Sequence, residues 1–445
     1  MHTASFRRCK FVPRDLHDVG LNQLRYLYSV VHYFGIPVIL AHLLWCSFRN
    51  PAYLERWTER FGFCERIDDG LHCIWIHAVS VGEVQAAIPV VKGLRERYPD
   101  STVVVTTTTP TGFERVKLAF GASVQHCYMP YDLPDAVNRF LDRVRPNLAI
   151  VFETELWPNL FHHCRRRCIA VLVVNARLSA RSAAGYAKLG GLAREMLANV
   201  SAFAVQSEDD AARLVALGAP PDRMSVTGSV KFDIRLPASL LEQAQALRRT
   251  WGVERSIWIA ASTHDGEDET VLDAFSLTLR RFPDALLVLV PRHPERFEKV
   301  TALCRRRGLT TARRSDCPAS CGELSILVGD TMGELSLFYA AADVAFVGGS
   351  LVPTGGHNML EPAALGVPVI FGPHIFNFAD IGRKLVDAGA AKQVENAGAL
   401  AEQVEVLFAD ANLRHATGQK ARDFVESNGG AGERVLALID EFLAS

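Results

Sequence analysis

The sequence predicts an α/β protein with two doubly wound domains and an apolar helix ahead of them. Three observations predict this fold: short apolar runs alternate with stretches of helical composition, the alternation occurs in two series, and one long apolar run precedes both. Continuous runs rich in Val and Ile are typical of strands buried on both faces of a parallel sheet. Alternation of strands with helices favours a doubly wound sheet.

The composition is that of a globular protein. The chain has 445 residues, of which 49% are hydrophobic and 22% are charged, and its net charge is −1. A chain of this length can bury large cores, and it suggests two or three domains. The small net charge creates no general attraction for nucleic acid, so we expect no nucleic-acid partner. The ten cysteines lack the spacing of a zinc site, which predicts reduced thiols in a cytosolic setting.

The first predicted element is an anchor helix at residues 23–48, after an extension at residues 1–22. Its apolar part is long enough to cross a bilayer, which needs about 20 residues. Polar residues and Pro37 interrupt it, and no small-residue cleavage site follows it. Basic residues flank both sides, so the positive-inside rule gives no orientation. We expect membrane attachment, through a spanning or an interfacial helix; a helix buried in the globular body is the alternative.

Two series of predicted strands follow the anchor. The first series defines a domain at residues 56–233, with strands at residues 73–79, 102–107, 148–153, 169–175 and 202–206. The second defines a domain at residues 240–445, with strands at residues 257–261, 286–291, 325–328, 344–348 and 367–372. Two such halves imply a cleft, and ligands of these sheets bind beyond the carboxyl ends of the strands.

Charged residues follow the strands of the first half. Glu83 follows a glycine where a strand gives way to a helix, which makes it a candidate general base. The alternative is a carboxylate that merely favours the helix N-terminus. Glu153 and Glu155 follow another strand beside Trp and Pro, where ordinary helix-start chemistry is again the alternative. Arg177 and Arg181 follow the next strand, where they either hold an anion or are solvated. These two arginines and the Arg165–Arg167 run are candidate contacts for lipid phosphates; for the run, a solvated face is the alternative.

The strand ends of the second half predict a nucleotide site. Arg292 directly follows a strand, and arginine binds phosphate with two hydrogen bonds. Residues 329–334 open a helix, whose backbone N–H groups attract phosphate. Glycines at 348–349 allow a close backbone approach, and Glu361 is suited to accept both hydroxyls of a ribose. A capping pair of Asn358 with Glu361 is the alternative, but Pro362 argues against it because it removes a backbone donor from the helix start.

At these residues the chain resembles the bacterial 3-deoxy-D-manno-oct-2-ulosonic acid (Kdo) transferases of lipid A assembly. The resemblance extends from about residue 56 to the C-terminus, and its matching segments occur in the same order as in that family. These segments are IHAVSVGE (76–83), ETELWPN (153–159), NARLSARS (175–182), TGSVKFD (227–233), STHDGE (262–267), VPRHPERF (290–297), GDTMGEL (329–335) and residues 346–362.

The resemblance implies a GT-B fold and an inverting transfer of Kdo from CMP-Kdo to a lipid A precursor, lipid IVA. It implies that Glu83 is the general base and that Glu153 and Lys231 stabilise the transition state. It places the enzyme at the inner membrane, in contact with membrane lipids and with its catalytic domains on the cytoplasmic side. It further implies that CMP is bound by Pro291, Arg292, Met332, Gly333, Glu334, Asn358, Met359, Leu360 and Glu361.

The sequence contains no Asp-x-Asp motif, and we expect neither a metal ion nor a cofactor. CMP-Kdo carries a single phosphate, which Arg292 and helix N-termini can neutralise. Two other functions remain open from the sequence. One is a different GT-B enzyme, such as a UDP-sugar transferase or epimerase. The other is a non-catalytic, membrane-bound protein that binds a nucleotide.

Overall fold

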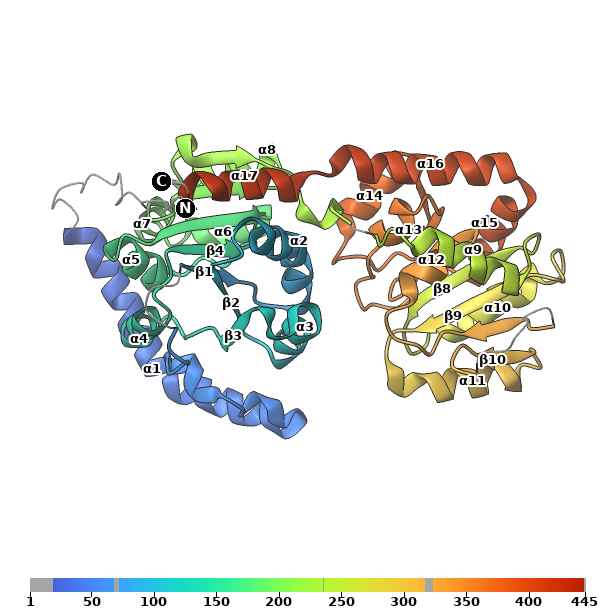
Figure 1. Ribbon diagram of the computed structural model, residues 1–445, viewed down its shortest axis with the longest axis horizontal. Coiled ribbons are helices and arrows are strands. Elements are labelled where there is room, and N and C mark those ends of the chain that lie inside the picture. Colours follow the sequence, from blue (N-terminus) through green and yellow to red (C-terminus); the bar gives the residue numbers. More distant parts are fainter. Residues whose placement is uncertain (1–18, 68–71, 235, 317–322, 444–445) are drawn as a thin grey trace. The chain divides into compact units, whose positions relative to one another are not determined.

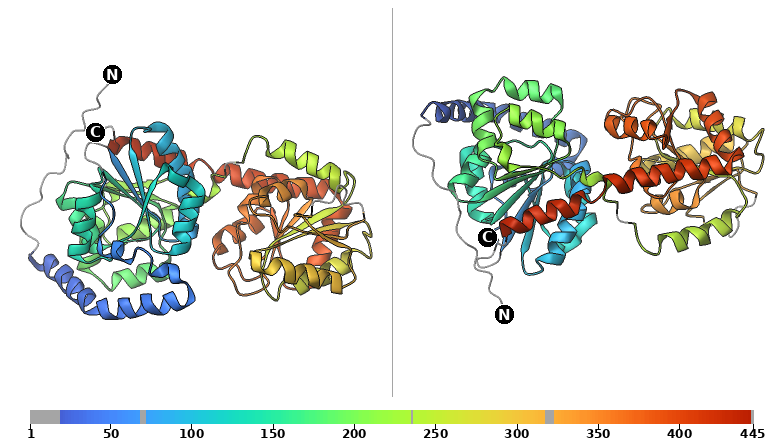
Figure 2. Two further views of the ribbon diagram at one scale, coloured as in Figure 1. Left: turned by 60° about the horizontal axis from the view of Figure 1, so that its bottom comes forward. Right: turned by 90° about the horizontal axis from the view of Figure 1, so that it is seen from above.

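The computed structural model describes residues 19–67, 72–234, 236–316 and 323–443, which form two compact units (Figure 1). The first unit comprises residues 1–233 with 429–445, and the second comprises residues 234–428. In each unit, helices cover both faces of a parallel sheet, as Figure 2 shows. Each unit is therefore a doubly wound domain of the predicted kind.

The first unit contains a seven-stranded sheet in the order β3-β2-β1-β4-β5-β6-β7. Alternate residues of a strand face opposite sides of a sheet, and in β1 Trp75 enters one core whereas Ile74 and Ile76 enter the other. The strands are β1 (Cys73–His77), β2 (Thr102–Thr107), β3 (Gln125–Tyr128), β4 (Leu148–Phe152), β5 (Ala170–Ala176), β6 (Ala202–Val205) and β7 (Met224–Val226). The helices are α1 (Val19–Arg49), α2 (Val81–Arg97), α3 (Pro110–Phe120), α4 (Pro134–Val144), α5 (Pro158–Arg166), α6 (Ala180–Ala187), α7 (Gly191–Ala198), α8 (Glu208–Ala216) and α17 (Ala431–Leu443), with short 3-10 turns that include η2 (Trp57–Phe61) and η5 (Val230–Phe232).

The second unit contains a seven-stranded sheet in the order β10-β11-β9-β8-β12-β13-β14. The strand order at one side of this sheet differs from that of the first sheet, because β11 lies between β9 and β10. The strands are β8 (Ile257–Thr263), β9 (Leu286–Pro291), β10 (Thr311–Arg313), β11 (Ile326–Val328), β12 (Val344–Val347), β13 (Val369–Phe371) and β14 (Ala391–Gln393). The helices are α9 (Leu240–Trp251), α10 (Asp268–Thr278), α11 (Phe297–Arg306), α12 (Leu335–Ala341), α13 (Leu360–Ala364), α14 (Ala379–Asp387), α15 (Ala397–Ala409) and α16 (Ala411–Asn428).

The C-terminal helix differs from the expected domain boundary. We expected residues 240–445 to form one domain, but α17 packs on the first unit. Leu436 and Ile439 of α17 are buried in the core that also contains residues of α2. Arg97 of α2 forms an ion pair with Glu433 at 2.5 Å and also pairs with Asp440. The apolar face of α17 completes the first core, so the chain returns to the first unit after completing the second.

Helix α1 lies along the outside of the first unit (Figure 1). Residues Gln23–Phe48 are long and apolar enough to cross a membrane, and 11% of the most apolar window is buried. One side of the helix contacts α5 and α7. The other side exposes apolar residues that include Leu27, Val31, Phe34, Val38 and Phe48. The predicted extension at residues 1–22 lies largely outside the described residues, which begin at Val19.

Candidate active site

Glu83 is held at the start of α2 by a reciprocal cap. Ser80 is the N-cap residue, and its Oγ accepts a hydrogen bond from the backbone N–H of Glu83 at 3.5 Å. In return, the Glu83 carboxylate accepts hydrogen bonds from the Val79 N–H at 2.9 Å and from the Ser80 hydroxyl at 3.2 Å. Reciprocal caps of this kind stabilise a helix start. The capping role that the sequence left open is therefore present, and it fixes the position of the carboxylate.

The surroundings of Glu83 suit a proton acceptor. Burial raises the pKa of its carboxyl to about 7; the Val79 N–H opposes this shift, and the negative charges of Glu153 and Glu155 add to it. A general base works best when its pKa lies near the operating pH. Capping and proton acceptance are thus compatible in this one side chain.

Glu153 and Lys231 form an ion pair in the same unit as Glu83. The Lys231 Nζ lies 3.0 Å from the Glu153 Oε1, and their side chains are 25% and 16% exposed. The second carboxylate oxygen of Glu153 lies 3.6 Å from the Nε of Arg177. The charge of Glu153 also raises the pKa of Glu83, so the two carboxylates influence each other within the unit. These three side chains are the ones to which the family resemblance assigned catalysis.

Two residues with left-handed backbone conformations position this pair. Glu153 follows β4 with a φ of +57°, and Asn175 lies in β5 with a φ of +53°. The Asn175 side chain accepts a hydrogen bond from the Val230 N–H at 3.2 Å, which fixes η5 and hence the backbone of Lys231. Positive φ is uncommon outside glycine, and strain of this kind clusters at functional sites. The left-handed backbone at Glu153 and Asn175 thus helps to set the positions of the Glu153 and Lys231 side chains.

The arginines that we expected to meet lipid phosphates lie at opposite ends of the strands of the first sheet. Arg177 and Arg181 follow β5 at its carboxyl end, and both are exposed. The Arg165–Arg167 run ends α5, which leads back to the amino end of β5. Arg167 also pairs with Asp142 of α4 at 2.6 Å. A helix between two parallel strands leads from the carboxyl end of one strand to the amino end of the next. The run is therefore remote from the candidate site, which lies at the carboxyl ends.

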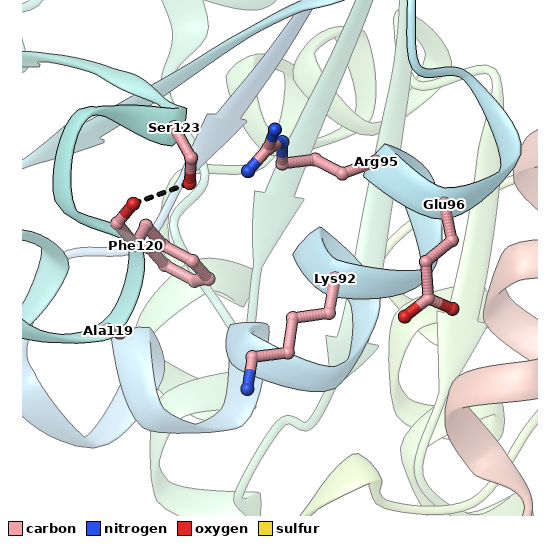
Figure 3. Close-up of a pocket in the computed structure, with 6 residues that line it drawn as sticks. All are labelled: Lys92, Arg95, Glu96, Ala119, Phe120 and Ser123. Atoms are coloured by element: carbon pink, nitrogen blue, oxygen red, sulfur yellow. Dashed lines mark hydrogen bonds between the residues drawn. The ribbon is translucent and has the colours of Figure 1, made fainter.

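A hollow of about 380 Å³ in the first unit lies away from these residues (Figure 3). Lys92, Arg95 and Glu96 line one side of it, near the last turn of α2. Glu83 is in the first turn of the same helix. A helix rises about 1.5 Å per residue, so roughly 14 Å or more of helix separates Glu83 from these residues. The hollow is no part of the candidate site.

In the second unit, Arg292 is available to bind an anion. It directly follows β9, and its backbone N–H donates to the Thr263 carbonyl at 3.0 Å. Its side chain is exposed and forms no hydrogen bond or ion pair with the described residues. Pro291 before it is buried. The guanidinium is thus free to bind a phosphate at the strand end.

The segment before α12 is held in place by Glu334. Its carboxylate accepts a hydrogen bond from the Arg314 Nη2 at 2.9 Å and another from the Thr331 hydroxyl. Burial opposes ionisation, but these hydrogen bonds and the charge of Arg314 lower the pKa of Glu334 overall. Met332 is 74% exposed, and Gly333 has a φ of +88°. Glu334 therefore organises this loop, whereas Met332 presents its side chain to solvent.

Asn358 and Glu361 form the capping contact that Pro362 led us to discount. The Asn358 Oδ1 accepts a hydrogen bond from the Leu360 N–H at 3.1 Å, and its Nδ2 donates to Glu361 at 3.1 Å. Pro362 does not prevent this contact, because it is the third residue of α13 and the first N–H groups of a helix have no partner within the helix. Met359 and Leu360 are fully buried. The contact between Asn358 and Glu361 that the sequence left open is therefore present, and it orients the Glu361 carboxylate.

The glycines at 348–349 approach a carboxylate of the protein itself. Glu267 is fully buried and accepts four backbone hydrogen bonds, two at Oε2 from His264 (3.1 Å) and Gly349 (2.7 Å) and two at Oε1 from Ser350 (3.0 Å) and Leu351 (2.9 Å). A Cβ at Gly348 would lie 2.8 Å from its Oε2. Sequence reasoning missed Glu267, although the motif that contains it follows a strand. The close backbone approach that we predicted at these glycines is therefore made to Glu267, whose carboxylate already accepts the N–H groups of residues 349–351.

Three histidines gather at the strand ends of the second unit, and sequence reasoning gave none of them a role. His264 follows β8, His293 follows β9, and His357 lies in the segment between β12 and α13. Each belongs to a segment that matched the family, so their placement after strands was the available signal.

Comparison with protein families divides the chain much as the structure does. Residues 55–234 match the model described as 3-deoxy-D-manno-octulosonic-acid transferase (kdotransferase). Residues 323–424 match the model described as glycosyl transferases group 1. The first match covers the part of the chain that contains Glu83, Glu153 and Lys231.

Proteins of known function extend the match to nearly the whole chain. The 3-deoxy-D-manno-octulosonic acid transferase of Haemophilus influenzae is 43% identical, over 94% of this chain and 99% of that protein. The enzyme of the same name from Bordetella pertussis is 40% identical, over 83% of this chain and 87% of that protein.

Among solved structures, UDP-GlcNAc 2-epimerase from Neisseria meningitidis has a TM-score of 0.54 at 14% identity, over 83% of this chain and 99% of that one. This likeness concerns the fold alone. Together with the glycosyl transferase match, it identifies the two doubly wound domains as a GT-B fold. The chain belongs to the 3-deoxy-D-manno-octulosonic acid transferase family and is a glycosyltransferase.

Proposed function

We propose that this enzyme transfers Kdo from CMP-Kdo to a hydroxyl of a lipid A precursor, lipid IVA, with inversion at the anomeric carbon. One observation supports the mechanism above all. A carboxyl with a pKa of about 7, that of Glu83, lies near a fixed Glu153–Lys231 ion pair in the same unit. A base and a fixed positive charge are what an inverting transfer to a hydroxyl requires.

In the proposed reaction, Glu83 accepts the proton of the acceptor hydroxyl. The hydroxyl oxygen attacks the anomeric carbon of Kdo from the face opposite CMP. The bond from that carbon to the phosphate oxygen breaks, and its electron pair leaves with CMP. Lys231 stabilises the negative charge of the Kdo carboxylate in the transition state. Glu153 is a positioning residue, because it holds the Lys231 ammonium at 3.0 Å.

For the donor, we propose that CMP is bound by the residues that the family resemblance assigns in the second unit. The phosphate of CMP-Kdo carries one negative charge, and the exposed Arg292 guanidinium can neutralise it with two hydrogen bonds. Arg314 holds Glu334 in place, and Asn358 orients Glu361. With the charge balanced by arginine, we propose that the reaction uses neither a metal ion nor a cofactor.

For the location, we propose that α1 lies in the cytoplasmic interface of the inner membrane rather than across it. Arg25 and Ser29 are buried, and both donate hydrogen bonds to the Asn159 Oδ1, at 3.3 and 3.1 Å. Tyr33 donates to Asp135 at 2.6 Å. A spanning helix would have to break these contacts or draw polar groups of the domain into hydrocarbon, which is costly. The exposed apolar face is suited to shallow insertion instead.

The transfer is tested with CMP-Kdo and a tetraacylated lipid A precursor in the presence of EDTA, with mass analysis of the product. We expect the wild type to add Kdo and Glu83→Gln to lose most of the rate, about 10²- to 10⁴-fold. Glu96→Gln, at the other end of α2, is the matched control and should keep full activity. No product from folded wild type, together with turnover of a UDP-sugar, would contradict the proposal. Full activity of Glu83→Gln would remove Glu83 as the base.

The location is tested with a protease-sensitive tag at the N-terminus. If α1 lies in the interface, the tag and both domains are on the same side of the membrane. We therefore expect digestion of the tag in inside-out vesicles and protection in intact spheroplasts. Digestion in spheroplasts would show that α1 spans the bilayer.

A further inference from the structure

The three histidines at the strand ends of the second unit are in mutual contact. The Nε2 atoms of His264 and His357 lie 2.8 Å apart, their ring centroids lie 5.0 Å apart, and their ring planes are 7° from parallel. The His293 ring lies edge-on to His264, with centroids 5.4 Å apart. Two nitrogens on a tetrahedral zinc ion would lie about 3.3 Å apart. The shorter distance is that of a hydrogen bond between the two imidazoles.

A hydrogen bond between two neutral imidazoles fixes which of their nitrogens carry a hydrogen. One Nε2 carries a hydrogen and the other accepts it, so the uncharged pair has a single N–H left, on one Nδ1. Neither Nδ1 has a hydrogen-bond partner among the described residues. Adding one proton at the bare Nδ1 preserves the contact. The pair then carries one positive charge and presents two N–H donors.

The groups around the pair disfavour that proton as long as no ligand is bound. Burial, His293 and the charges of Arg296 and Arg292 lower the pKa of His264. Burial, His264, Arg292 and His293 lower that of His357, to about 4. The nearby carboxylates are engaged elsewhere: Glu267 with backbone N–H groups, Asp268 with Arg296, and Asp265 with Lys299. An arriving anion would reverse this balance.

Part of the backbone at these strand ends is unavailable to an anion. Glu267 already accepts the N–H groups of Gly349, Ser350 and Leu351, which would otherwise form an anion site. An anion that reaches the ends of β8, β9 and β12 therefore depends more on side chains. Those available are Arg292 and the histidines.

We propose that the His264–His357 pair, together with Arg292, forms the subsite for the donor phosphate and takes up one proton as CMP becomes the leaving group. This inference rests on the proposed function, because it assumes a CMP-linked sugar as donor. When the bond to the anomeric carbon breaks, the phosphate changes from one negative charge to two. The acceptor's proton goes to Glu83, and the proton of the pair comes from solvent. The pair remains protonated while CMP is bound, and both charges are balanced.

The proposal is tested by calorimetric titration of the full chain in detergent with CMP, at pH 7.5, in two buffers of different ionisation enthalpy. The difference between the buffers counts the protons taken up. We expect the wild type to take up close to one proton per CMP. His357→Gln and His264→Gln keep a hydrogen-bonding group but bind no proton, so uptake should fall towards zero. We expect Kd for CMP to rise by roughly tenfold or more, as for the loss of a charge-assisted hydrogen bond.

His415→Gln, on the exposed surface of α16, is the matched control and should behave as the wild type does. Wild type that binds CMP without proton uptake would overturn this inference and leave the proposed function standing. Uptake that persists in both glutamine variants would also overturn it, because the proton would then lie elsewhere. A folded wild type that binds no CMP would contradict the proposed function itself.

Discussion

The two sheets carry different chemistry at their carboxyl ends. In the first unit, the groups are carboxylates with one paired ammonium: Glu83, Glu153 and Lys231. In the second, they are a guanidinium and imidazoles, while the buried carboxylate of Glu267 is saturated by four backbone N–H groups. The first set can accept a proton and hold a positive charge. The second can hold an anion.

Because of this difference, we expect changes in the first unit to alter the rate of transfer and changes in the second unit to alter the affinity for CMP. Damage to the first unit's set should slow the transfer and leave CMP binding intact. Damage to the second unit's set should weaken CMP binding before it slows the transfer.

After Glu83→Gln, the largest expected effect comes from breaking the ion pair. Lys231→Met should reduce kcat by about 10²- to 10³-fold, because a fixed positive charge is lost from the transition state. Glu153→Gln should slow the reaction less, and the double variant should be no slower than Lys231→Met, because the two side chains act as a unit. Steady-state kinetics of the four proteins test this. Kd for CMP should stay within twofold throughout, and Lys188→Met is the exposed control.

The corresponding change in the second unit is Arg292→Lys. Lysine keeps the charge but loses the bidentate geometry, so Kd for CMP and KM for the donor should rise about tenfold, whereas kcat should change less than threefold. Titration with CMP and steady-state kinetics measure both. Arg306→Lys, at the exposed end of α11, is the control. A large loss of kcat with unchanged Kd would remove the division between the two units.

The strands that the sequence predicted are the interior ones. All ten lie inside the two sheets, where burial on both faces requires continuous apolar runs. The four strands that it missed, β3, β7, β10 and β14, are the edge strands of the two sheets. Each has three or four residues and is partly solvated, so no apolar run marks it. The packing of α17 on the first unit was also invisible, because only the folded core shows which apolar face it completes.

The candidate site also has residues that the sequence could predict and contacts that it could not. Glu153 and Arg292 could be found because each directly follows a strand, and Glu83 because it opens the helix after one. Chain order places such strand ends together. The Glu153–Lys231 pair could not be derived from chain order, because it depends on Asn175 holding η5 in place. The His264–His357 contact joins residues 93 positions apart, which no local pattern can show.

A smaller effect is expected at α1. Phe34→Ser and Val38→Ser remove exposed apolar groups that we place in the interface. Each should weaken binding to anionic vesicles by roughly fivefold, or about 1 kcal/mol, which is less than the value for full burial of such a side chain. Vesicle sedimentation measures this. Turnover of an acceptor in detergent should be unchanged, and Val406→Ser, on α15, should bind vesicles as the wild type does.

The smallest effect is expected at Arg167. Arg167→Gln breaks a partly exposed ion pair with Asp142 at the amino edge of the first sheet. Such pairs contribute about 1 kcal/mol or less, so thermal unfolding should shift only slightly. The rate of transfer to vesicle-bound acceptor should stay within twofold of wild type. A large loss of this activity would restore the Arg165–Arg167 run as a lipid-phosphate contact.

The most direct test of the account is the pH dependence of kcat/KM for the acceptor, measured with saturating CMP-Kdo so that donor binding contributes no proton. Glu83 works as a base only when it is deprotonated, and burial raises its pKa to about 7. We expect the rate to fall about tenfold for each pH unit below 7. For Glu83→Gln we expect a slow, flat profile over that range. A wild-type rate that stays constant from pH 8 to 5.5, or the same fall at acidic pH in Glu83→Gln, would contradict the role of Glu83 as the base.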